Sequence, residues 1–453
     1  MRVHFIAIGG AAMHNLALAL RKKGFYITGS DDEIFEPSRS RLSAEGLLPE
    51  QFGWYPDRIT RGLDAVILGM HARKDNPELL KAQELGLKIY SYPEYIYEQS
   101  LHKIRVVIGG SHGKTTITSM VMHVLSRLGM DFDYMVGSQV DGFETMVRLT
   151  EEAPVIILEG DEYLSSPIDL RSKFLWYKPQ IALLTGIAWD HINVFPTWES
   201  YVETFNKFLT SMPSGAYLTY FEEDETLNLI TKQHQDKIIE PYSTHPNLLK
   251  DGVSFLNTQN GEVPLKVFGE HNLQNISGAL NICKQIGISD QEFYATIGSF
   301  KGAAKRLQTI AETDSSRVFL DFAHSPSKLK ATTKAVKDQF TNRKLVACME
   351  LHTFSSLKKV FLPQYAHSMD VADVAVVYFN PHTVEHKKLE PVSEQEVFDA
   401  FENPKLKVYT DASKIVEFLK TVEYKNCNLL LMTSGNFDGV DLKGLAKELL
   451  IKK

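Results

Sequence analysis

The first hundred residues alternate between short apolar runs and segments whose apolar residues recur at helical spacing. Val3 to Ile8 is typical of a buried strand, and a Gly9-Gly10 turn and a helical pattern follow it. A second strand ends in Gly29-Ser30-Asp31, and later strands are predicted at 65–68 and 88–90. This order of elements predicts a Rossmann-like βαβ domain.

The alternation continues through two further regions. Ile104 to Ile108 is an apolar run before a glycine-rich turn and a helix, further strands are predicted at 155–158 and 181–185, and a more β-rich insertion with an Asn260-Gly261 hairpin signal runs from 217 to 268. After Lys301-Gly302 the pattern restarts, with strands at 318–321, 345–349, 374–378, 407–409 and 429–433. A chain of 453 residues exceeds one compact core. We therefore predict an α/β fold of three domains: a Rossmann-like domain at 1–100, a central P-loop domain with a mostly parallel sheet at 101–302, and a Rossmann-like domain at 303–453.

Composition narrows the classes of partner. The net charge of −7 shows no basic excess, so nucleic acid is not an expected partner. No apolar stretch reaches the roughly 18 residues of a membrane helix, and the N-terminus lacks an export signal, so no membrane contact is expected. Three widely spaced cysteines (Cys283, Cys348, Cys427) are typical of reduced core thiols in a cytoplasmic protein.

The segment Ile108 to Thr116 predicts a phosphate-binding loop, because it lies where a strand ends and a helix begins. Gly110 and Gly113 allow backbone N–H groups to approach phosphate oxygens, Lys114 can reach the β- and γ-phosphates, and Thr115 can place a hydroxyl on Mg²⁺. Ile108 stands where a strict P-loop has its first glycine. The alternative is a glycine-rich turn followed by a surface lysine.

Polar residues also follow other predicted strands. Glu159 and the pair Asp190-His191 come after apolar strands, where ligand sites of α/β proteins gather, and they suit Mg²⁺ or Mn²⁺ bound with substrate phosphates. The alternative is that each is a polar residue leaving a strand. Asn272 and Asn275 lie on one helix face, where amides can bind a base.

Other segments carry weaker signals. Arg306 and the Asp321-to-Pro326 segment could close over a nucleotide. The Gly9-Gly10 turn does not meet G-x-G-x-x-G, which favours a phosphorylated ligand other than a dinucleotide. His382 and His386 lie between prolines, and we expect a solvated loop there rather than a metal site.

Taken together, these motifs resemble the Mur ligase family of ATP-dependent amide-bond-forming enzymes over essentially the whole chain. The matching segments are Gly110 to Thr116, Glu159 to Glu162, Asp190-His191, Gly269 to Asn275, Lys305-Arg306 and Asp321 to Pro326. The resemblance implies ATP as cofactor, bound by Gly110, Ser111, His112, Gly113, Lys114, Thr115, Thr116, Asn272, Asn275, Arg306 and Asp321. It implies Mg²⁺, with Mn²⁺ as a possibility, held by Thr115, Glu159 and His191, and catalytic roles for Lys114, Glu159 and His191. It also implies a UDP-sugar at Gly9, Gly10, Ser30 and Asp31.

Within the family, the chain resembles the subgroup that acts on UDP-N-acetylmuramate. That subgroup joins either L-alanine or the murein tripeptide L-Ala-γ-D-Glu-meso-diaminopimelate, in peptidoglycan synthesis or recycling. Glu350 to Ser356 lacks the two arginines of the alanine-adding motif Q-P-H-R-[FY]-[ST]-R. We therefore predict the tripeptide as acceptor, with His324, Glu350 and His352 binding substrate, and keep L-alanine as the alternative.

Some positions depart from the family motifs. Ala12 replaces the third glycine of the opening turn, Gly186 the asparagine of T-N-I, and Lys305 the first arginine of R-R. Lys207 does not align with the carbamylated lysine of some members, and we expect a surface role for it. The rival functions are an NTP-dependent switch, which would not need a UDP-sugar domain, and a nicotinamide-dependent oxidoreductase built on the first domain.

Overall fold

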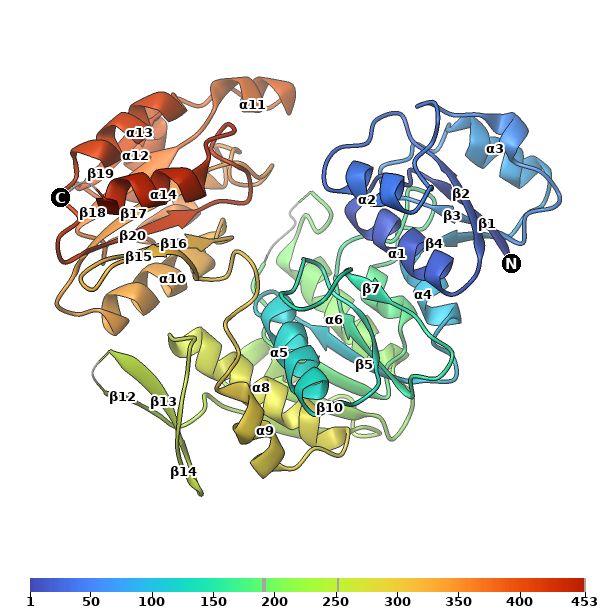
Figure 1. Cartoon of the computed structure of the whole chain (residues 1–453), viewed down its shortest axis with the longest axis horizontal. Coiled ribbons are helices and arrows are strands. Elements are labelled where there is room, and N and C mark those ends of the chain that lie inside the picture. The colour runs from blue at the N-terminus through green and yellow to red at the C-terminus, as the bar shows by residue number, and fades with distance from the viewer. Residues whose placement is uncertain (190–192, 251, 452–453) are drawn as a thin grey trace. The chain divides into compact units, whose positions relative to one another are not determined.

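The computed structural model describes residues 1–189, 193–250 and 252–451. The chain divides into two compact units (Figure 1). The first comprises Met1–Ser243 and Asn275–Ile297, and the second comprises Thr244–Gln274 and Gly298–Lys453. Both units are α/β, and most of their strands are parallel, which confirms the predicted fold class.

The first unit contains a four-stranded parallel sheet near the N-terminus, with the order β2-β1-β3-β4. Its strands are β1 (Arg2–Ile6), β2 (Tyr26–Ser30), β3 (Ala65–Leu68) and β4 (Ile89–Ser91), and its helices are α1 (Ala11–Lys22), α2 (Ser38–Ala44), α3 (Pro77–Glu84) and α4 (Tyr92–Glu98). Ile6 lies opposite Ser30 in the register, so β1 and β2 end side by side. This is the predicted Rossmann-like arrangement, which places the Gly9-Gly10 turn beside Asp31.

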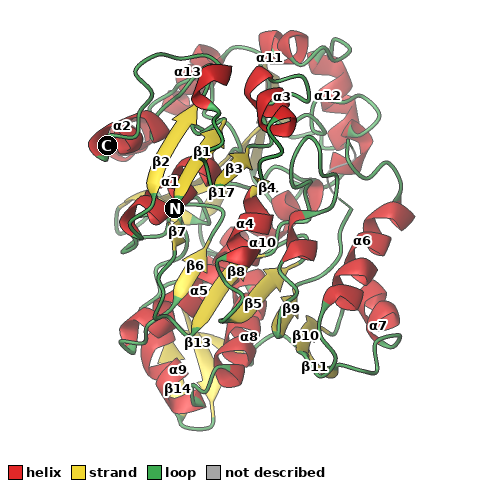
Figure 2. Cartoon of the chain, turned by 90° about the vertical axis from the view of Figure 1, so that its right-hand side faces the viewer, coloured by secondary structure: helices red, strands yellow, loops and turns green. Residues whose placement is uncertain are grey.

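A seven-stranded sheet with the order β11-β10-β9-β5-β8-β6-β7 forms the rest of the first unit. Figure 2 shows β5, β8 and β6 running side by side. The strands are β5 (Ile104–Gly109), β6 (Asp133–Met135), β7 (Val147–Arg148), β8 (Val155–Glu159), β9 (Ile181–Leu184), β10 (Tyr217–Phe221) and β11 (Ile238–Tyr242), and only β7 is antiparallel to its neighbour. Ile108 pairs with Glu159, and Gly109 pairs with Leu184. The carboxyl ends of the three central strands therefore meet at the glycine-rich loop.

The helices of this part are α5 (Lys114–Arg127), α6 (Trp198–Ser211), α7 (Glu225–Thr231) and α9 (Asp290–Ile297). Helix α8 (Glu270–Gln285) belongs to the first unit from Asn275 onward. Buried aromatic rings of α6 pack against the short 3-10 helix Lys173–Trp176, where Phe174 stacks on Phe208 at a centroid distance of 4.5 Å. This packing fixes which face of α6 is buried.

The second unit holds two sheets. The hairpin strands β12 (Asn247–Lys250), β13 (Val253–Thr258) and β14 (Gly261–Pro264) are antiparallel, and Thr258 pairs with Gly261, so the predicted hairpin is confirmed. The larger sheet has the order β15-β16-β20-β17-β18-β19, with only β15 antiparallel to its neighbour. Its strands are β15 (Gln308–Glu312), β16 (Arg317–Asp321), β17 (Lys344–Glu350), β18 (Val374–Tyr378), β19 (Leu406–Tyr409) and β20 (Cys427–Met432). The doubly wound third region predicted from the sequence is therefore present.

The helices of the larger sheet are α10 (Pro326–Gln339), α11 (Pro381–His386), α12 (Glu394–Phe401), α13 (Ala412–Thr421) and α14 (Leu442–Ile451). The prediction of a loop at His382 and His386 was wrong, because both lie in α11. Asn380 caps this helix with its side chain, and Pro381 occupies the first helical position, so two local signals start a helix that the bounding prolines seemed to forbid. Both histidines are exposed.

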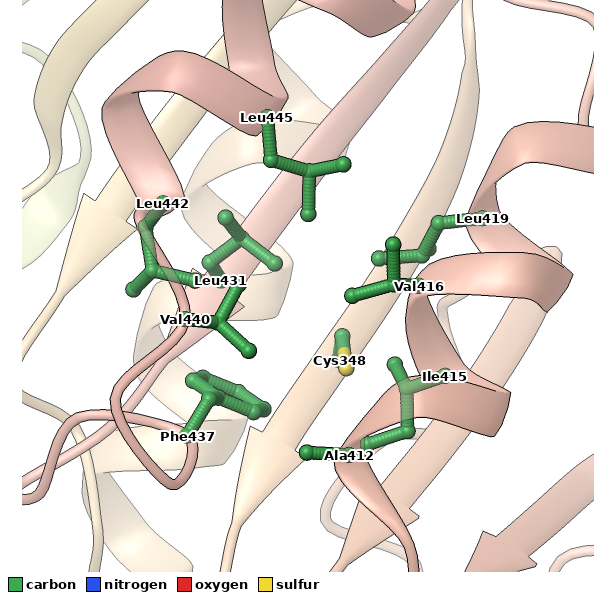
Figure 3. Close-up of a pocket in the computed structure, with 10 residues that line it drawn as sticks. All are labelled: Cys348, Ala412, Ile415, Val416, Leu419, Leu431, Phe437, Val440, Leu442 and Leu445. Atoms are coloured by element: carbon green, nitrogen blue, oxygen red, sulfur yellow. The ribbon is translucent and has the colours of Figure 1, made fainter.

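The three cysteines are free and buried, as the sequence predicted. Cys348 lies on β17 in an apolar pocket between the sheet and helices α13 and α14, beside Ile415, Leu431 and Phe437 (Figure 3). Burial raises the pKa of the Cys348 thiol far above its ordinary value. This thiol is therefore a core group and not a nucleophile. None of the described helices is long and apolar enough to cross a bilayer.

Candidate active site

The loop between β5 and α5 depends on two glycines. Gly110 has a φ of 117° and Gly113 a φ of 78°, in the left-handed region that favours glycine. A Cβ at Gly110 would lie 2.1 Å from the Thr185 hydroxyl, and one at Gly113 would lie 2.3 Å from the Asn275 side-chain oxygen. Gly113 is also the N-cap residue of α5, and no described side chain accepts a hydrogen bond from the N–H groups of the first turn. The positive end of the dipole of this fourteen-residue helix is therefore available to bind an anion in the loop.

Lys114 is the first residue of α5 and extends back along the loop. Its ammonium lies 2.7 Å from a Glu162 carboxylate oxygen and donates a 2.5 Å hydrogen bond to the Gly110 carbonyl. Burial favours the neutral amine, but the carboxylates of Glu162 and Asp161 outweigh it and raise the pKa of Lys114. The side chain is thus a fixed cation beside the loop, as a phosphate-binding lysine must be.

Thr115 and Glu159 lie together at the base of the same loop. The Thr115 hydroxyl donates a 2.8 Å hydrogen bond to one Glu159 carboxylate oxygen, and the Gly137 N–H donates a 2.7 Å bond to the other. Burial raises the pKa of Glu159, although these two donors and Lys114 oppose it. Two hard oxygen donors beside a phosphate loop suit Mg²⁺, and a divalent cation would relieve the cost of burying this carboxylate. The residues present therefore fit the predicted metal.

The third predicted metal ligand, His191, lies outside the described residues, as does Asp190. Within the described ranges, no group of three or more His, Cys, Asp or Glu side chains is placed to hold a metal ion. The predicted set of Thr115, Glu159 and His191 therefore stays a prediction.

A hydrogen-bonded network that the sequence did not predict connects α6 to this site. The Tyr201 hydroxyl lies 2.9 Å from the Ser111 hydroxyl and donates a 3.0 Å bond to the Glu162 carboxylate. The Ala188 N–H donates to the Ser111 oxygen at 2.8 Å. Tyr201 is fully buried among aromatic rings of α6, so its sequence pattern indicated only a core residue.

The other loop residues support its shape. The Thr185 hydroxyl donates a hydrogen bond to the His112 carbonyl, and Thr116 is buried in the first turn of α5. Asn272 and Asn275, both predicted to bind the nucleotide, have different surroundings. Asn275 lies against Gly113, whereas the Asn272 amide donates a 2.7 Å bond to the Phe268 carbonyl, two residues before its own helix begins.

In the second unit, Asp321 organises the turn that carries Arg306. Its carboxylate accepts 2.7 Å hydrogen bonds from the Leu307 and Ala323 N–H groups. Lys305 and Leu307 both have left-handed backbone angles, with φ of 54° and 45°. The Arg306 guanidinium lies 4.9 Å from the centre of the Phe322 ring. Asp321 therefore fixes the backbone directly after Arg306 and that of its own turn, and each of its carboxylate oxygens already accepts a hydrogen bond.

Glu350 ends β17 next to the loop that follows β20. Its carboxylate accepts hydrogen bonds from the Thr433 hydroxyl and, at 3.0 Å, from the Phe437 N–H. His352 Nδ1 lies 3.5 Å from the other oxygen. Burial would raise the pKa of Glu350, but the donors from His352, Thr433 and Phe437 lower it. Glu350 is thus an ionised carboxylate that holds this sheet edge together.

His324 belongs to the same sheet edge through the end of β16. Its Nδ1 lies 2.8 Å from the Phe322 carbonyl, and its own carbonyl accepts a hydrogen bond from the Tyr365 hydroxyl. Asp321 at the end of β16 pairs with Met432 of β20, which in turn pairs with Met349 of β17. The candidate acceptor residues therefore follow β16 and β17, the two strands that flank β20.

The first sheet carries the remaining predicted residues. The Gly9 N–H donates a 2.7 Å hydrogen bond to Asp31, and α1 starts after Gly10 with no side-chain cap. Burial raises the pKa of Asp31 to about 6. The Ser30 hydroxyl is buried and has no hydrogen-bond partner among the described residues. A turn with a helix N-terminus and a buried hydroxyl beside it suits a phosphorylated ligand.

Three family models match consecutive parts of this chain. The "Mur ligase family, catalytic domain" model matches residues 2–103, the "Mur ligase middle domain" model matches 108–283, and the "Mur ligase, glutamate ligase domain" model matches 305–435. The chain belongs to the Mur ligase family. This Mur ligase is an ATP-dependent, ADP-forming ligase, as the resemblance implied, and its relatives act in peptidoglycan metabolism.

Two relatives match this Mur ligase over nearly its whole length. The UDP-N-acetylmuramate–L-alanine ligase of Carboxydothermus hydrogenoformans is 26% identical, over 99% of this chain and 97% of that protein. The UDP-N-acetylmuramate–L-alanyl-γ-D-glutamyl-meso-2,6-diaminoheptandioate ligase of Haemophilus influenzae is 27% identical, over 98% of both. The crystal structure of UDP-N-acetylmuramate–alanine ligase from Thermotoga maritima shares the fold, with a TM-score of 0.71, 20% identity and coverage of 99% of this chain and 98% of that one.

Proposed function

We propose that this Mur ligase joins the carboxylate of UDP-N-acetylmuramate to the amine of L-Ala-γ-D-Glu-meso-diaminopimelate in peptidoglycan recycling. The observation that carries the choice of acceptor is the environment of Glu350. There an ionised, buried carboxylate, bonded to Thr433 and Phe437 and close to His352, lies at the expected acceptor site. The Haemophilus influenzae relative, whose name gives this acceptor, supports the proposal.

The nucleotide half of the reaction uses the loop and its flanking side chains. We place the ATP phosphates on the N–H groups at the start of α5, with the Lys114 ammonium offsetting the charge of the transferred phosphoryl group. Thr115 and Glu159 would hold Mg²⁺, together with His191. When bound, Mg²⁺ would neutralise charge on the phosphate oxygens.

The reaction then proceeds in two steps. A carboxylate oxygen of UDP-N-acetylmuramate attacks the γ-phosphorus, the bond to the β-phosphate oxygen breaks, and ADP leaves. The acceptor amine attacks the acyl carbon of the acyl phosphate, the carbon–oxygen bond to phosphate breaks, and the amine gives up one proton as the amide forms. Catalysis of this kind rests on positioning and charge neutralisation, so no serine or cysteine nucleophile is required.

The acceptor site has few cations to bind a free amino acid. A small zwitterion needs a guanidinium or a similar group for its carboxylate, and bidentate arginine pairs are the strongest such contacts. Residues 350–356 contain one histidine and no arginine, and His352 already lies beside Glu350. A longer peptide spreads its recognition over more contacts and depends less on one ion pair.

A second candidate is the ligation of L-alanine to the same sugar nucleotide. The Carboxydothermus hydrogenoformans relative supports it as strongly as the other relative supports the tripeptide, because the two identities are 26% and 27%. The choice between L-alanine and the tripeptide as acceptor therefore depends on the residues of the acceptor site alone.

The test is a comparison of kcat/KM for the two acceptors. Purified protein receives ATP, Mg²⁺ and UDP-N-acetylmuramate with either the tripeptide or L-alanine, and ADP release and product mass are followed. We expect the tripeptide to be used far better. A preference for L-alanine would refute the choice of acceptor but not the ligase, whereas ATP hydrolysis without a ligated product from either acceptor would refute the proposed function.

A further inference from the structure

The hydrogen bonds around Tyr201 run in one direction. An ionised carboxylate only accepts hydrogen bonds, so the Tyr201 proton points to Glu162. The Tyr201 oxygen then accepts the proton of Ser111, and the Ser111 oxygen accepts from the Ala188 N–H. Glu162 also accepts from Lys114 on its second oxygen. Each polar group of this network therefore has a defined role in orienting the next.

We infer that Tyr201 is a positioning residue for phosphoryl transfer, acting through Glu162 on Lys114. The inference rests on the proposed ATP-dependent ligation. Tyr201 binds one Glu162 oxygen at 3.0 Å while Lys114 binds the other at 2.7 Å, so the tyrosine sets the plane of the carboxylate that holds the lysine. Its second contact, with Ser111, ties the same hydroxyl to the loop itself.

The ring and the hydroxyl of Tyr201 have separable roles. The ring is fully buried and packs against Phe195 at 5.2 Å and Phe205 at 5.3 Å between centroids, which phenylalanine would reproduce. Only the hydroxyl reaches Ser111 and Glu162. A core residue would tolerate Tyr201→Phe, whereas a positioning residue would not.

Tyr201→Phe should therefore weaken the use of ATP without affecting the sugar nucleotide. Removing a hydrogen bond to a charged group corresponds to a loss of about 10- to 100-fold, and we expect this loss in kcat/KM for ATP. The dissociation constant for ATP, measured by titration calorimetry, should rise in parallel, while KM for UDP-N-acetylmuramate should stay within about twofold. The matched control is Tyr220→Phe. The Tyr220 hydroxyl forms a 2.9 Å hydrogen bond to Asn228 and takes no part in the site.

A double-mutant cycle with Lys114→Met distinguishes positioning from an independent structural effect. If Tyr201 acts through Lys114, adding Tyr201→Phe to Lys114→Met should weaken ATP binding by less than twofold beyond the lysine variant. Independent addition of the two losses, or wild-type ATP affinity and turnover in Tyr201→Phe, would overturn the inference. Should Tyr201→Phe fail to fold, Glu162→Gln gives the second arm, and it should reproduce the rise in the ATP dissociation constant.

The two proposals can fail separately. Wild-type protein that binds ATP but ligates neither acceptor refutes the proposed function, and the calorimetric cycle then still decides whether Tyr201 controls ATP binding through Lys114. Normal ligation with ATP affinity that does not respond to Tyr201→Phe or Glu162→Gln refutes the role of Tyr201 alone.

Discussion

Lys114→Met should abolish ligation and also lower the free energy of unfolding by about 3 to 5 kcal/mol. The ammonium lies 2.7 Å from Glu162, whose side chain is 1% exposed, while the Lys114 side chain is 14% exposed. Methionine fills the space of the lysine methylenes but leaves the Glu162 carboxylate without the cation that neutralises it. Removing one partner of a buried ion pair has a cost of this size because the remaining charge is uncompensated.

Adding Glu162→Gln to Lys114→Met separates stability from activity. Glutamine keeps the shape of the side chain and an oxygen for the Tyr201 hydroxyl, but it carries no charge. We expect most of the lost stability to return. Turnover should stay at least about a thousandfold below wild type, because neither residue then supplies positive charge to the phosphates.

Tryptophan fluorescence is a suitable probe for both variants, because all four tryptophans (Trp54, Trp176, Trp189, Trp198) lie in the unit that holds Lys114. Urea unfolding of wild type and variants then reports that unit, and ADP release reports turnover. Wild-type stability in Lys114→Met, or recovered turnover in the double variant, would refute the reasoning.

Three further predictions concern the other parts of the site. Gly113→Ala should lower ATP affinity at least about tenfold. The control Gly129→Ala has a similar φ of 69° but open space around it, so it should only lower the free energy of unfolding by the backbone strain of about 1 to 2 kcal/mol. Equal ATP affinities of the two variants would contradict this prediction. Gly435→Ala should raise KM for the acceptor at least about tenfold and leave KM for ATP unchanged, because the added Cβ would lie 2.8 Å from the Glu350 carboxylate and from the His352 imidazole. Gly62→Ala, whose Cβ would meet no atom within 3.5 Å, is the control. The pKa of Asp31 is raised from 3.8 to about 6, so the folded state keeps a proton that the unfolded chain releases, and the free energy of unfolding should fall by about 3 kcal/mol as pH rises from below 4 to above 6. Urea midpoints of wild type and Asp31→Asn across this range check it, and parallel pH profiles would count against it.

The strands were predictable where an apolar run ended in a glycine or an acid. Ile104 to Ile108 and Val155 to Leu158 became β5 and β8, and the glycine-rich loop between β5 and α5 was predictable from its glycines and from the flanking strand and helix. Short edge strands such as β7 (Val147–Arg148) carry too few residues for a periodic signal. The cap of α11 at Asn380 was visible in the sequence but was outweighed by the prolines.

The contacts between distant segments could not be predicted from the sequence. Tyr201 reads as one aromatic residue on the buried face of a helix, and nothing in its neighbours indicates that its hydroxyl meets Ser111, 90 positions away. Glu350 and Thr433 are likewise 83 positions apart and meet only because β17 and β20 are neighbours in the sheet. Such pairs depend on strand order, which hydrophobic periodicity does not specify.

The three acids at the end of β8 and directly after it, Glu159, Asp161 and Glu162, have different roles. Asp161 lies 2.6 Å from Lys173, and despite its burial this cation and Lys114 lower its pKa, so it is a structural carboxylate. Glu162 is neutralised by Lys114. Glu159 forms no ion pair with a lysine or arginine in the part of the chain that the structure describes, and burial raises its pKa. It is thus the acid of this segment whose negative charge is least compensated by the protein. A divalent cation at Glu159 would supply the missing positive charge next to the Thr115 hydroxyl, on the loop where we propose that the ATP phosphates bind.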